Sequence, residues 1–188
     1  HPLLVIRTDT WMKPANLLYI LSDEHNRDSL GCYGHPLVQT PNLDRLAAGG
    51  VLFRSAYTNC PICVPARASL ATGQYVHSIR YWDNAFPYDG RVKGWGHRLM
   101  TAGHRVDSVG KLHYRSVNDD DGFTEKILPL NVVDGIGDLM GSLRTDIPVR
   151  TGSRAGITGA GPGTSTYLDY DVQIADHCCQ WLEEASAG

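Results

Sequence analysis

The sequence predicts an α/β fold with a mainly parallel sheet flanked by helices. Three observations support this prediction: short apolar runs recur along the chain, helical patterns alternate with those runs, and polar residues follow where each run ends. Neighbouring parallel strands must be joined by a crossover, usually a helix, so this alternation is typical of a parallel sheet.

Three segments have the composition of strands. Residues 15–23 (ANLLYILSD) are a short apolar run preceded by Pro14, residues 51–58 (VLFRSAYT) are rich in β-prone side chains, and residues 104–110 (HRVDSVG) alternate weakly. We therefore expect three strands in this order along the chain.

Three further segments have helix signals and lie between or beside these strands. In residues 40–50 (TPNLDRLAAGG), a threonine can cap the helix, a proline suits its first turn and a glycine can end it. Residues 65–73 (PARASLATG) begin with proline and end with glycine, and residues 94–103 (GWGHRLMTAG) place apolar side chains on one helical face. Strands and helices are thus expected to alternate.

The end of the chain carries a longer helical pattern. Its apolar side chains recur at spacings of four and three residues, which predicts an amphipathic helix; they are Leu168, Val172, Ala175, Cys179 and Leu182. Residues 115–166 lose this periodicity, so we expect them to be loop-rich. Because the predicted sheet has few strands, we expect it to be incomplete and the chain to be a fragment of a longer protein.

Composition and charge argue against several classes of partner. The net charge is −3, and the 17 Lys and Arg residues are scattered, whereas nucleic-acid and membrane surfaces attract proteins with clustered basic residues. No apolar run reaches the roughly 20 residues of a membrane span, and the first residues lack a secretory signal pattern. The five cysteines do not form a disulfide framework. We therefore expect a cytoplasmic protein without nucleic-acid or membrane partners.

Polar clusters follow all three predicted strands. In an open α/β sheet, ligands bind at the carboxyl ends of the strands, so these clusters are expected to form one site. The first cluster is Asp23, Glu24 and His25, the second is Cys60 with Cys63 to Arg67, and the third is Lys111 with His113.

The residue types in these clusters indicate a substrate class. Carboxylates suit a divalent, oxygen-binding metal, and Arg and Lys near a helix start suit a tetrahedral oxyanion such as sulfate or phosphate. A thiol at that helix start would have a lowered pKa and greater reactivity. Together they favour displacement at sulfur or phosphorus over acyl transfer.

A redox function is an alternative for the same residues. Cys60 and Cys63 form a C-x-x-C pair between a predicted strand and a predicted helix, as in thioredoxin-like oxidoreductases. That interpretation leaves Arg67 and the acidic and Lys-x-His clusters unexplained. A structural alternative also remains, in which Asp23 and Glu24 only solubilise a loop and Lys111 and His113 form an ordinary turn.

The eleven-residue stretch CVPARASLATG resembles a family signature. It runs from Cys63 to Gly73 and is similar to the C-x-P-x-R and Leu-x-Thr-Gly pattern of type I, formylglycine-dependent sulfatases. SDEHN (22–26), GKLH (110–113) and QTPNLDRLAAGGVLFRSAYT (39–58) also look like segments of this family. The resemblance implies an alkaline-phosphatase-like α/β fold, of which this chain would be the N-terminal part of the catalytic domain.

The resemblance also implies a nucleophile and its partners. Cys63 would be converted to formylglycine by a formylglycine-generating or sulfatase-maturing enzyme, and Arg67 would support the finished nucleophile. Lys111 and His113 would contact the sulfate and the formylglycine hydroxyls. The substrate would be a small-molecule sulfate ester.

For the metal, the resemblance implies Ca²⁺, with Mn²⁺ or Mg²⁺ as alternatives. Asp23 matches a metal-binding aspartate, and Glu24 occupies a neighbouring position where relatives often carry Asp or Gln. The family's other metal ligands lie C-terminal to the region covered here.

The segment after the predicted nucleophile indicates which branch of the family the chain resembles. In YWDNAFPYDG (81–90), Asn84 looks like an active-site asparagine of choline sulfatases and of formylglycine-dependent phosphonate monoester hydrolases. We therefore expect Asn84 to bind substrate, and a phosphonate or phosphate ester hydrolase on the same scaffold remains the alternative to a sulfatase.

Overall fold

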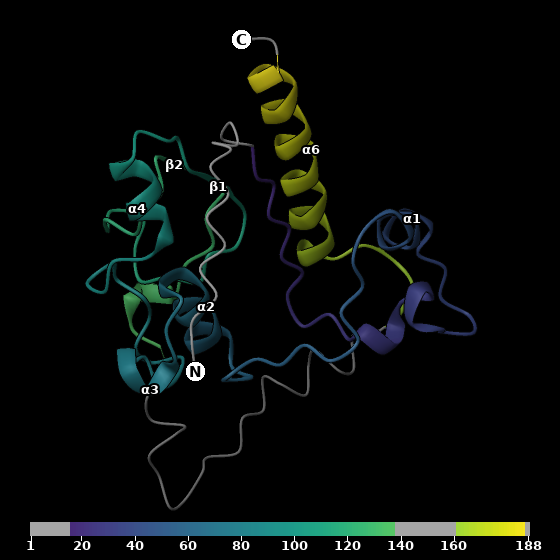
Figure 1. Ribbon diagram of the computed structural model, residues 1–188, viewed down its shortest axis with the longest axis horizontal. Coiled ribbons are helices and arrows are strands. Elements are labelled where there is room, and N and C mark those ends of the chain that lie inside the picture. Colours follow the sequence, from purple (N-terminus) through teal and green to yellow (C-terminus); the bar gives the residue numbers. More distant parts are fainter. Residues whose placement is uncertain (1–15, 138–160, 187–188) are drawn as a thin grey trace, which may run out of the picture. The chain divides into compact units, whose positions relative to one another are not determined.

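The computed structural model describes residues 16–137 and 161–186 (Figure 1). The chain divides into two compact units, His1–Ser55 and Ala56–Gly188. Each unit is described by itself. Among the described residues, no helix is long and apolar enough to cross a membrane.

The first unit contains one α-helix and two short 3₁₀ helices. These are η1 (Arg27–Ser29), η2 (Gly31–Tyr33) and α1 (Pro41–Gly49), so the helix expected over residues 40–50 is confirmed. The Thr40 side chain makes no capping bond to α1; instead its hydroxyl donates to Asp44 Oδ1 at 2.8 Å and accepts from the Gly31 N–H at 2.9 Å. Thr40 and Asp44 therefore tie α1 to η2.

Two of the three expected strands do not form. Residues 16–23 and 51–58 make no strand in the part of the chain that the structure describes, and their apolar side chains are exposed, with Leu17 at 81% and Ile20 at 77%. A strand exists only where another strand satisfies its backbone N–H and C=O groups. Apolar composition does not supply such a partner, which is why the sequence pattern was misleading here.

The second unit holds the remaining elements. Strands β1 and β2 are parallel neighbours, with Asp107 opposite Glu125 and Val109 opposite Ile127, which confirms the third expected strand and the parallel α/β arrangement. Strand β2 lies within the segment expected to be loop-rich. The elements are α2 (Cys63–Thr72), α3 (Val76–Ile79), α4 (Trp95–Thr101), β1 (Asp107–Val109), β2 (Glu125–Ile127), η3 (Val133–Gly135) and α6 (Thr166–Ser186).

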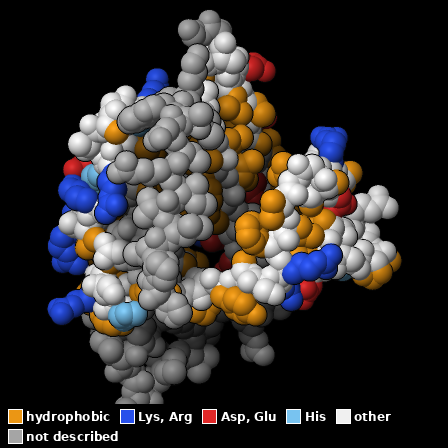
Figure 2. All heavy atoms as spheres, viewed as in Figure 1, with side chains coloured by type: hydrophobic (Ala, Val, Ile, Leu, Met, Phe, Trp, Pro, Cys, Tyr) orange, Lys and Arg blue, Asp and Glu red, His pale blue; other side chains and the backbone are white. Residues whose placement is uncertain are grey.

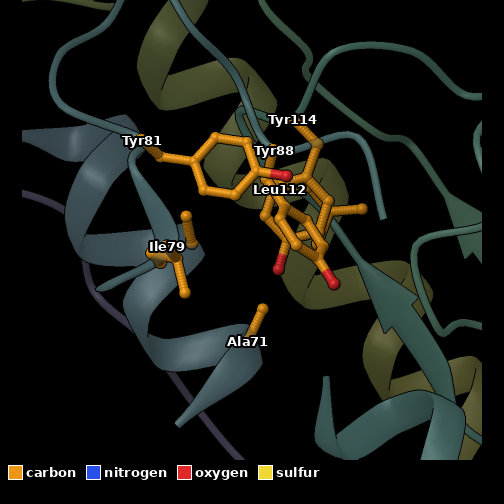
Figure 3. Packing of buried hydrophobic residues seen from close by; sticks show 7 residues of the cluster. Ala71, Ile79, Tyr81, Tyr88, Leu112 and Tyr114 are labelled. Carbon is orange, nitrogen blue, oxygen red and sulfur yellow. The ribbon is translucent and has the colours of Figure 1, made fainter. Parts of the chain in front are cut away.

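The core of the second unit is built around three tyrosines. The Tyr88 ring lies edge-on to Tyr81 and Tyr114, with ring centroids 5.6 and 4.8 Å away, and Leu112 packs with them (Figure 3). Burial raises the pKa of Tyr81 to about 12. Ala68 and Ala71 join this cluster from α2. The core therefore fixes α2 against the segment that carries Leu112 and Tyr114.

Helix α6 contacts the rest of the second unit through a face that the sequence did not predict. Its half-buried residues are Tyr170, Ile174, Cys178 and Trp181. The Tyr170 hydroxyl donates to the Leu128 carbonyl at 2.7 Å, and Trp181 Nε1 donates to Asp107 Oδ2 at 3.0 Å.

The helix expected at the end of the chain is thus confirmed, but its expected apolar stripe is exposed. Leu168 is 48% exposed and Val172 is 52% exposed. Figure 2 shows hydrophobic side chains at the surface where Figure 1 draws α6. Two polar anchors, Tyr170 and Trp181, set the contact face, and apolar periodicity alone does not detect such anchors.

Candidate active site

Cys63 is the first residue of α2, where the chain turns from extended backbone into helix. The preceding residue, Ile62, has φ −123° and ψ 139° and caps no helical N–H with its side chain. Instead, Asn84 Oδ1 accepts the Val64 N–H at 3.0 Å. An asparagine twenty residues further along the chain therefore caps this helix, directly beside Cys63.

The Ser-Leu-Ala-Thr-Gly tail of the signature ends α2. Gly73 has φ +68°, a left-handed conformation that favours glycine, and its N–H donates to the Ser69 carbonyl at 2.8 Å. The Ser69 hydroxyl donates to the Gln74 carbonyl at 2.6 Å and accepts from Asn59 Nδ2 at 2.6 Å. The tail therefore fixes the helix end, while the chemistry is concentrated at its start.

Arg67 connects α2 to the loop after β1. It lies four residues after Cys63, so both residues are on one face of the helix. Its side chain is buried, and Nη1 donates to the Lys111 carbonyl at 2.6 Å. Burial raises the pKa of Tyr170, and the positive charge of Arg67 opposes that increase. The charge of Arg67 therefore also influences the Tyr170 hydroxyl of α6. The structure thus brings Arg67 and Lys111 together.

The Lys111 loop requires a glycine before it. Gly110 has φ +90°, and a Cβ at this position would lie 2.6 Å from Ile174 Cδ1 of α6. Leu112 is buried in the tyrosine core just after Lys111. The Lys111 backbone is therefore held from both sides, by α6 and by the core.

His113 sits in a strained conformation against a second segment of the chain. Its φ is +58°, and its N–H donates to the Leu130 carbonyl at 2.7 Å. The Val132 N–H in turn donates to the Tyr114 carbonyl at 2.9 Å. Left-handed backbone at a non-glycine residue is uncommon and is often found at functional sites.

Residues 130–137 therefore border the candidate site, which the sequence did not predict. Besides the contacts to His113 and Tyr114, Gly137 lies so close to Asn84 that a Cβ at 137 would be 2.0 Å from the Asn84 carbonyl oxygen. The signal that could have found this border is the apolar run ILPL (127–130), which begins at the last residue of β2 and leads into this segment.

The two predicted metal ligands belong to the first unit. Asp23 and Glu24 form an exposed turn in which Glu24 has φ +53°, and Ser22 Oγ lies 3.1 Å from His25 Nδ1 across it. Asp23 and Glu24 are described with that unit, whereas Cys63, Arg67, Lys111 and His113 are described with the second.

The fit of this turn to a divalent cation is partial. Carboxylate oxygens are the donors that Ca²⁺ prefers, but Ca²⁺ takes about six to eight of them. Over residues 16–137 and 161–186, no group of three or more His, Cys, Asp or Glu side chains could hold a metal ion. The donor type therefore fits, but the number of donors is too small for a complete site.

Comparison with known proteins decides the family. Residues 15–142 match the family model described as Sulfatase. The chain belongs to the sulfatase family. The matched stretch contains all seven residues predicted for the site.

Curated sulfatases match over the same part of the chain. The N-acetylglucosamine-6-O-sulfatase of Bacteroides thetaiotaomicron is 32% identical over 59% of this chain and 20% of its own length. The choline-sulfatase of Rhizobium meliloti is 33% identical over 60% of this chain and 22% of its own length. Human arylsulfatase A is 48% identical over 33% of this chain and 12% of its own length. The chain thus spans about a fifth of these sulfatases or less.

Two solved structures confirm the alkaline-phosphatase-like fold. A protein in complex with its substrate D-glucosamine-2-N,6-O-disulfate aligns with a TM-score of 0.51 and 31% identity, over 55% of this chain and 21% of the other. The phosphonate monoester hydrolase of Agrobacterium radiobacter aligns with a TM-score of 0.56 and 25% identity, over 84% of this chain and 36% of the other.

Proposed function

We propose that the protein hydrolyses a sulfate monoester, with a formylglycine hydrate derived from Cys63 as the nucleophile. The observation that best supports this is the position of Cys63 as the first residue of α2, on one helical face with a buried Arg67 that binds the Lys111 backbone. Membership of the sulfatase family supports the same reaction.

The start of α2 suits an oxyanion. Backbone N–H groups and the positive end of the helix dipole favour a negative charge there. Arg67 adds a fixed positive charge one turn into the helix, and Lys111 adds an ammonium group on the neighbouring loop. These charges would stabilise the transferring sulfuryl group as negative charge develops on it.

Formylglycine at position 63 would supply two hydroxyl groups in its hydrated form. One would attack sulfur and displace the alcohol of the ester, and deprotonation of the other would expel sulfate and restore the aldehyde. The residues around it then have separate tasks. His113 would accept the proton of the second hydroxyl. Asn84 would keep the start of α2 in place through its bond to Val64 and would bind substrate.

Two partners are part of this proposal. A formylglycine-generating or sulfatase-maturing enzyme would convert Cys63, and a divalent metal ion, Ca²⁺ or else Mn²⁺ or Mg²⁺, would be held by Asp23 and Glu24 together with further ligands. When bound, the metal would supply Lewis-acid chemistry to the reaction.

A phosphonate or phosphate ester hydrolase is the second candidate. The aligned phosphonate monoester hydrolase covers more of this chain than the aligned substrate complex does, and the same site would suit either tetrahedral anion. A thioredoxin-like oxidoreductase using Cys60 and Cys63 is a more distant candidate, and family membership argues against it.

A substrate panel separates these functions. The protein carrying this sequence, produced together with a maturing enzyme, would be assayed on an aryl sulfate, choline sulfate, a phosphonate monoester and a disulfide substrate. We expect sulfate ester hydrolysis that Cys63→Ala lowers by about 10⁴-fold or more and that Cys60→Ser leaves close to the wild-type rate. Preferred turnover of the phosphonate would support the second candidate, and disulfide reduction that needs both cysteines would support the third.

A further inference from the structure

Asn131 carries a buried amide oxygen that has no hydrogen-bond partner in the part of the chain that the structure describes. Leaving a buried acceptor unsatisfied forfeits the hydrogen bonds that it would make to water, so native proteins keep few of them. Such a group often marks a position where function requires an acceptor. No role was expected for Asn131 from the sequence.

The backbone places Asn131 beside His113. The residue before it, Leu130, accepts the His113 N–H at 2.7 Å, and the residue after it, Val132, donates to the Tyr114 carbonyl at 2.9 Å. Asn131 therefore lies opposite His113 and Tyr114 in this irregular pairing. Both of these backbone N–H groups are already used, so neither satisfies the Asn131 side chain.

The His113 imidazole is the side-chain donor that this placement offers. Its Nδ1 is enclosed in the protein, as is Asn131 Oδ1. The two side chains start from neighbouring backbone positions, as the bonds to Leu130 and from Val132 show, so the amide oxygen is a candidate acceptor for the ring N–H.

We propose that Asn131 is a positioning residue for His113, whose amide oxygen accepts the Nδ1–H of the imidazole. In a neutral imidazole, one nitrogen carries the proton and the other is the acceptor. An acceptor at Nδ1 therefore leaves Nε2 unprotonated and available to take a proton. The catalytic importance of this unprotonated Nε2 rests on the proposed function, whereas the prediction of the tautomer is independent of that function.

The tautomer can be measured directly. Long-range ¹H–¹⁵N spectra of the protein labelled at its eight histidines report which ring nitrogen carries the proton, and His113→Gln assigns the His113 signals. We expect His113 to be the Nδ1–H tautomer in the wild type. Asn131→Leu, which has a similar shape and no acceptor, should shift it towards Nε2–H, and Asn131→Asp, which keeps an acceptor, should retain Nδ1–H.

Each outcome of this experiment decides the proposal. An Nε2–H tautomer in the wild type overturns it, and so does an Nδ1–H tautomer that persists in Asn131→Leu. If Asn131→Leu does not fold, the wild-type and Asn131→Asp spectra still decide, because the loss of Nδ1–H in either one contradicts the proposal.

Kinetics give a second readout in the wild-type and variant enzymes. Asn131→Leu should lower kcat by about 10- to 100-fold, as is usual when the partner that orients a functional imidazole is removed, with KM little changed. Asn131→Asp should recover most of kcat. An inactive wild type with the expected tautomer would contradict the proposed function and leave the positioning of His113 supported.

Discussion

Helix α2 and residues 16–23 both have strong sequence patterns, yet they differ in what surrounds them. In α2, buried residues occur along the whole helix, and its start, middle and end are each bonded to another segment, through Asn84, Lys111 and Asn59. In residues 16–23, apolar side chains such as Leu17 are exposed. The difference teaches that a helix satisfies its own backbone, whereas a strand depends on partners elsewhere in the chain.

The same difference applies to the two halves of the candidate site. The nucleophile position, the buried guanidinium and the Lys111 loop are joined within the second unit, while the two carboxylates lie on an exposed turn of the first. Matched substitutions, one in each unit, test whether the second unit holds its residues more firmly.

The largest difference is expected for two arginines that each donate to a backbone carbonyl. Arg67 is buried and donates to Lys111, and Arg27 is exposed and donates to Arg54. Arg67→Ala should lower the free energy of unfolding of its unit by about 3 kcal/mol, because a part-buried carbonyl loses a charged donor and a buried side chain is removed. Arg27→Ala should cost about 0.5 kcal/mol or less. Amide hydrogen exchange measures both, and equal losses would contradict the comparison.

A smaller difference is expected for two glycines. A Cβ at Gly94 would lie 2.1 Å from the Ala71 carbonyl oxygen, whereas a Cβ at Gly49, the last residue of α1, would meet nothing within 4 Å. Gly94→Ala should therefore destabilise its unit by about 2 kcal/mol, and Gly49→Ala should stabilise its helix by about 0.5 kcal/mol. Urea unfolding followed in each unit tests this pair, and tolerance of Gly94→Ala would show that α2 and the Gly94 turn are packed more loosely.

The smallest difference is expected for two exposed asparagines that cap helices. Asn84 Oδ1 accepts the Val64 N–H of α2, and Asn26 Oδ1 accepts the Asp28 N–H of η1, both at 3.0 Å. Asn84→Ala should cost about 1 kcal/mol and should also lower activity, because α2 carries Cys63. Asn26→Ala should cost less, since η1 has only three residues. Asn84→Asp keeps the acceptor and is expected to restore the stability, and failure to do so would mean that the cap is not the reason for the loss.

Much of the second unit could be predicted from the sequence because its signals are local. Proline and glycine predicted a helix over residues 65–73, which the structure shows as α2 (Cys63–Thr72), and the weak alternation of residues 104–110 contains β1. The parallel α/β fold followed from the same signals. The predicted grouping of Arg67 with Lys111 agrees with their hydrogen bond, and the catalytic roles of the site residues stay predictions.

The rest depended on contacts between distant segments. The bond from Val64 to Asn84, the border formed by residues 130–137 and the contact face of α6 each join residues far apart in sequence. No periodicity encodes such pairs. The strand predicted for residues 16–23 was wrong for the same reason, since the composition of the segment says nothing about a partner strand.

The central claim is that Cys63 becomes the nucleophile through modification. The most direct measurement is the mass of the proteolytic peptide that contains Cys63, from active protein produced together with a maturing enzyme. Our account predicts the mass change for replacing the CH₂–SH group by an aldehyde, and capture of that aldehyde by a hydrazide probe with loss of activity. Full sulfatase activity in protein whose Cys63 peptide keeps its thiol mass would contradict it.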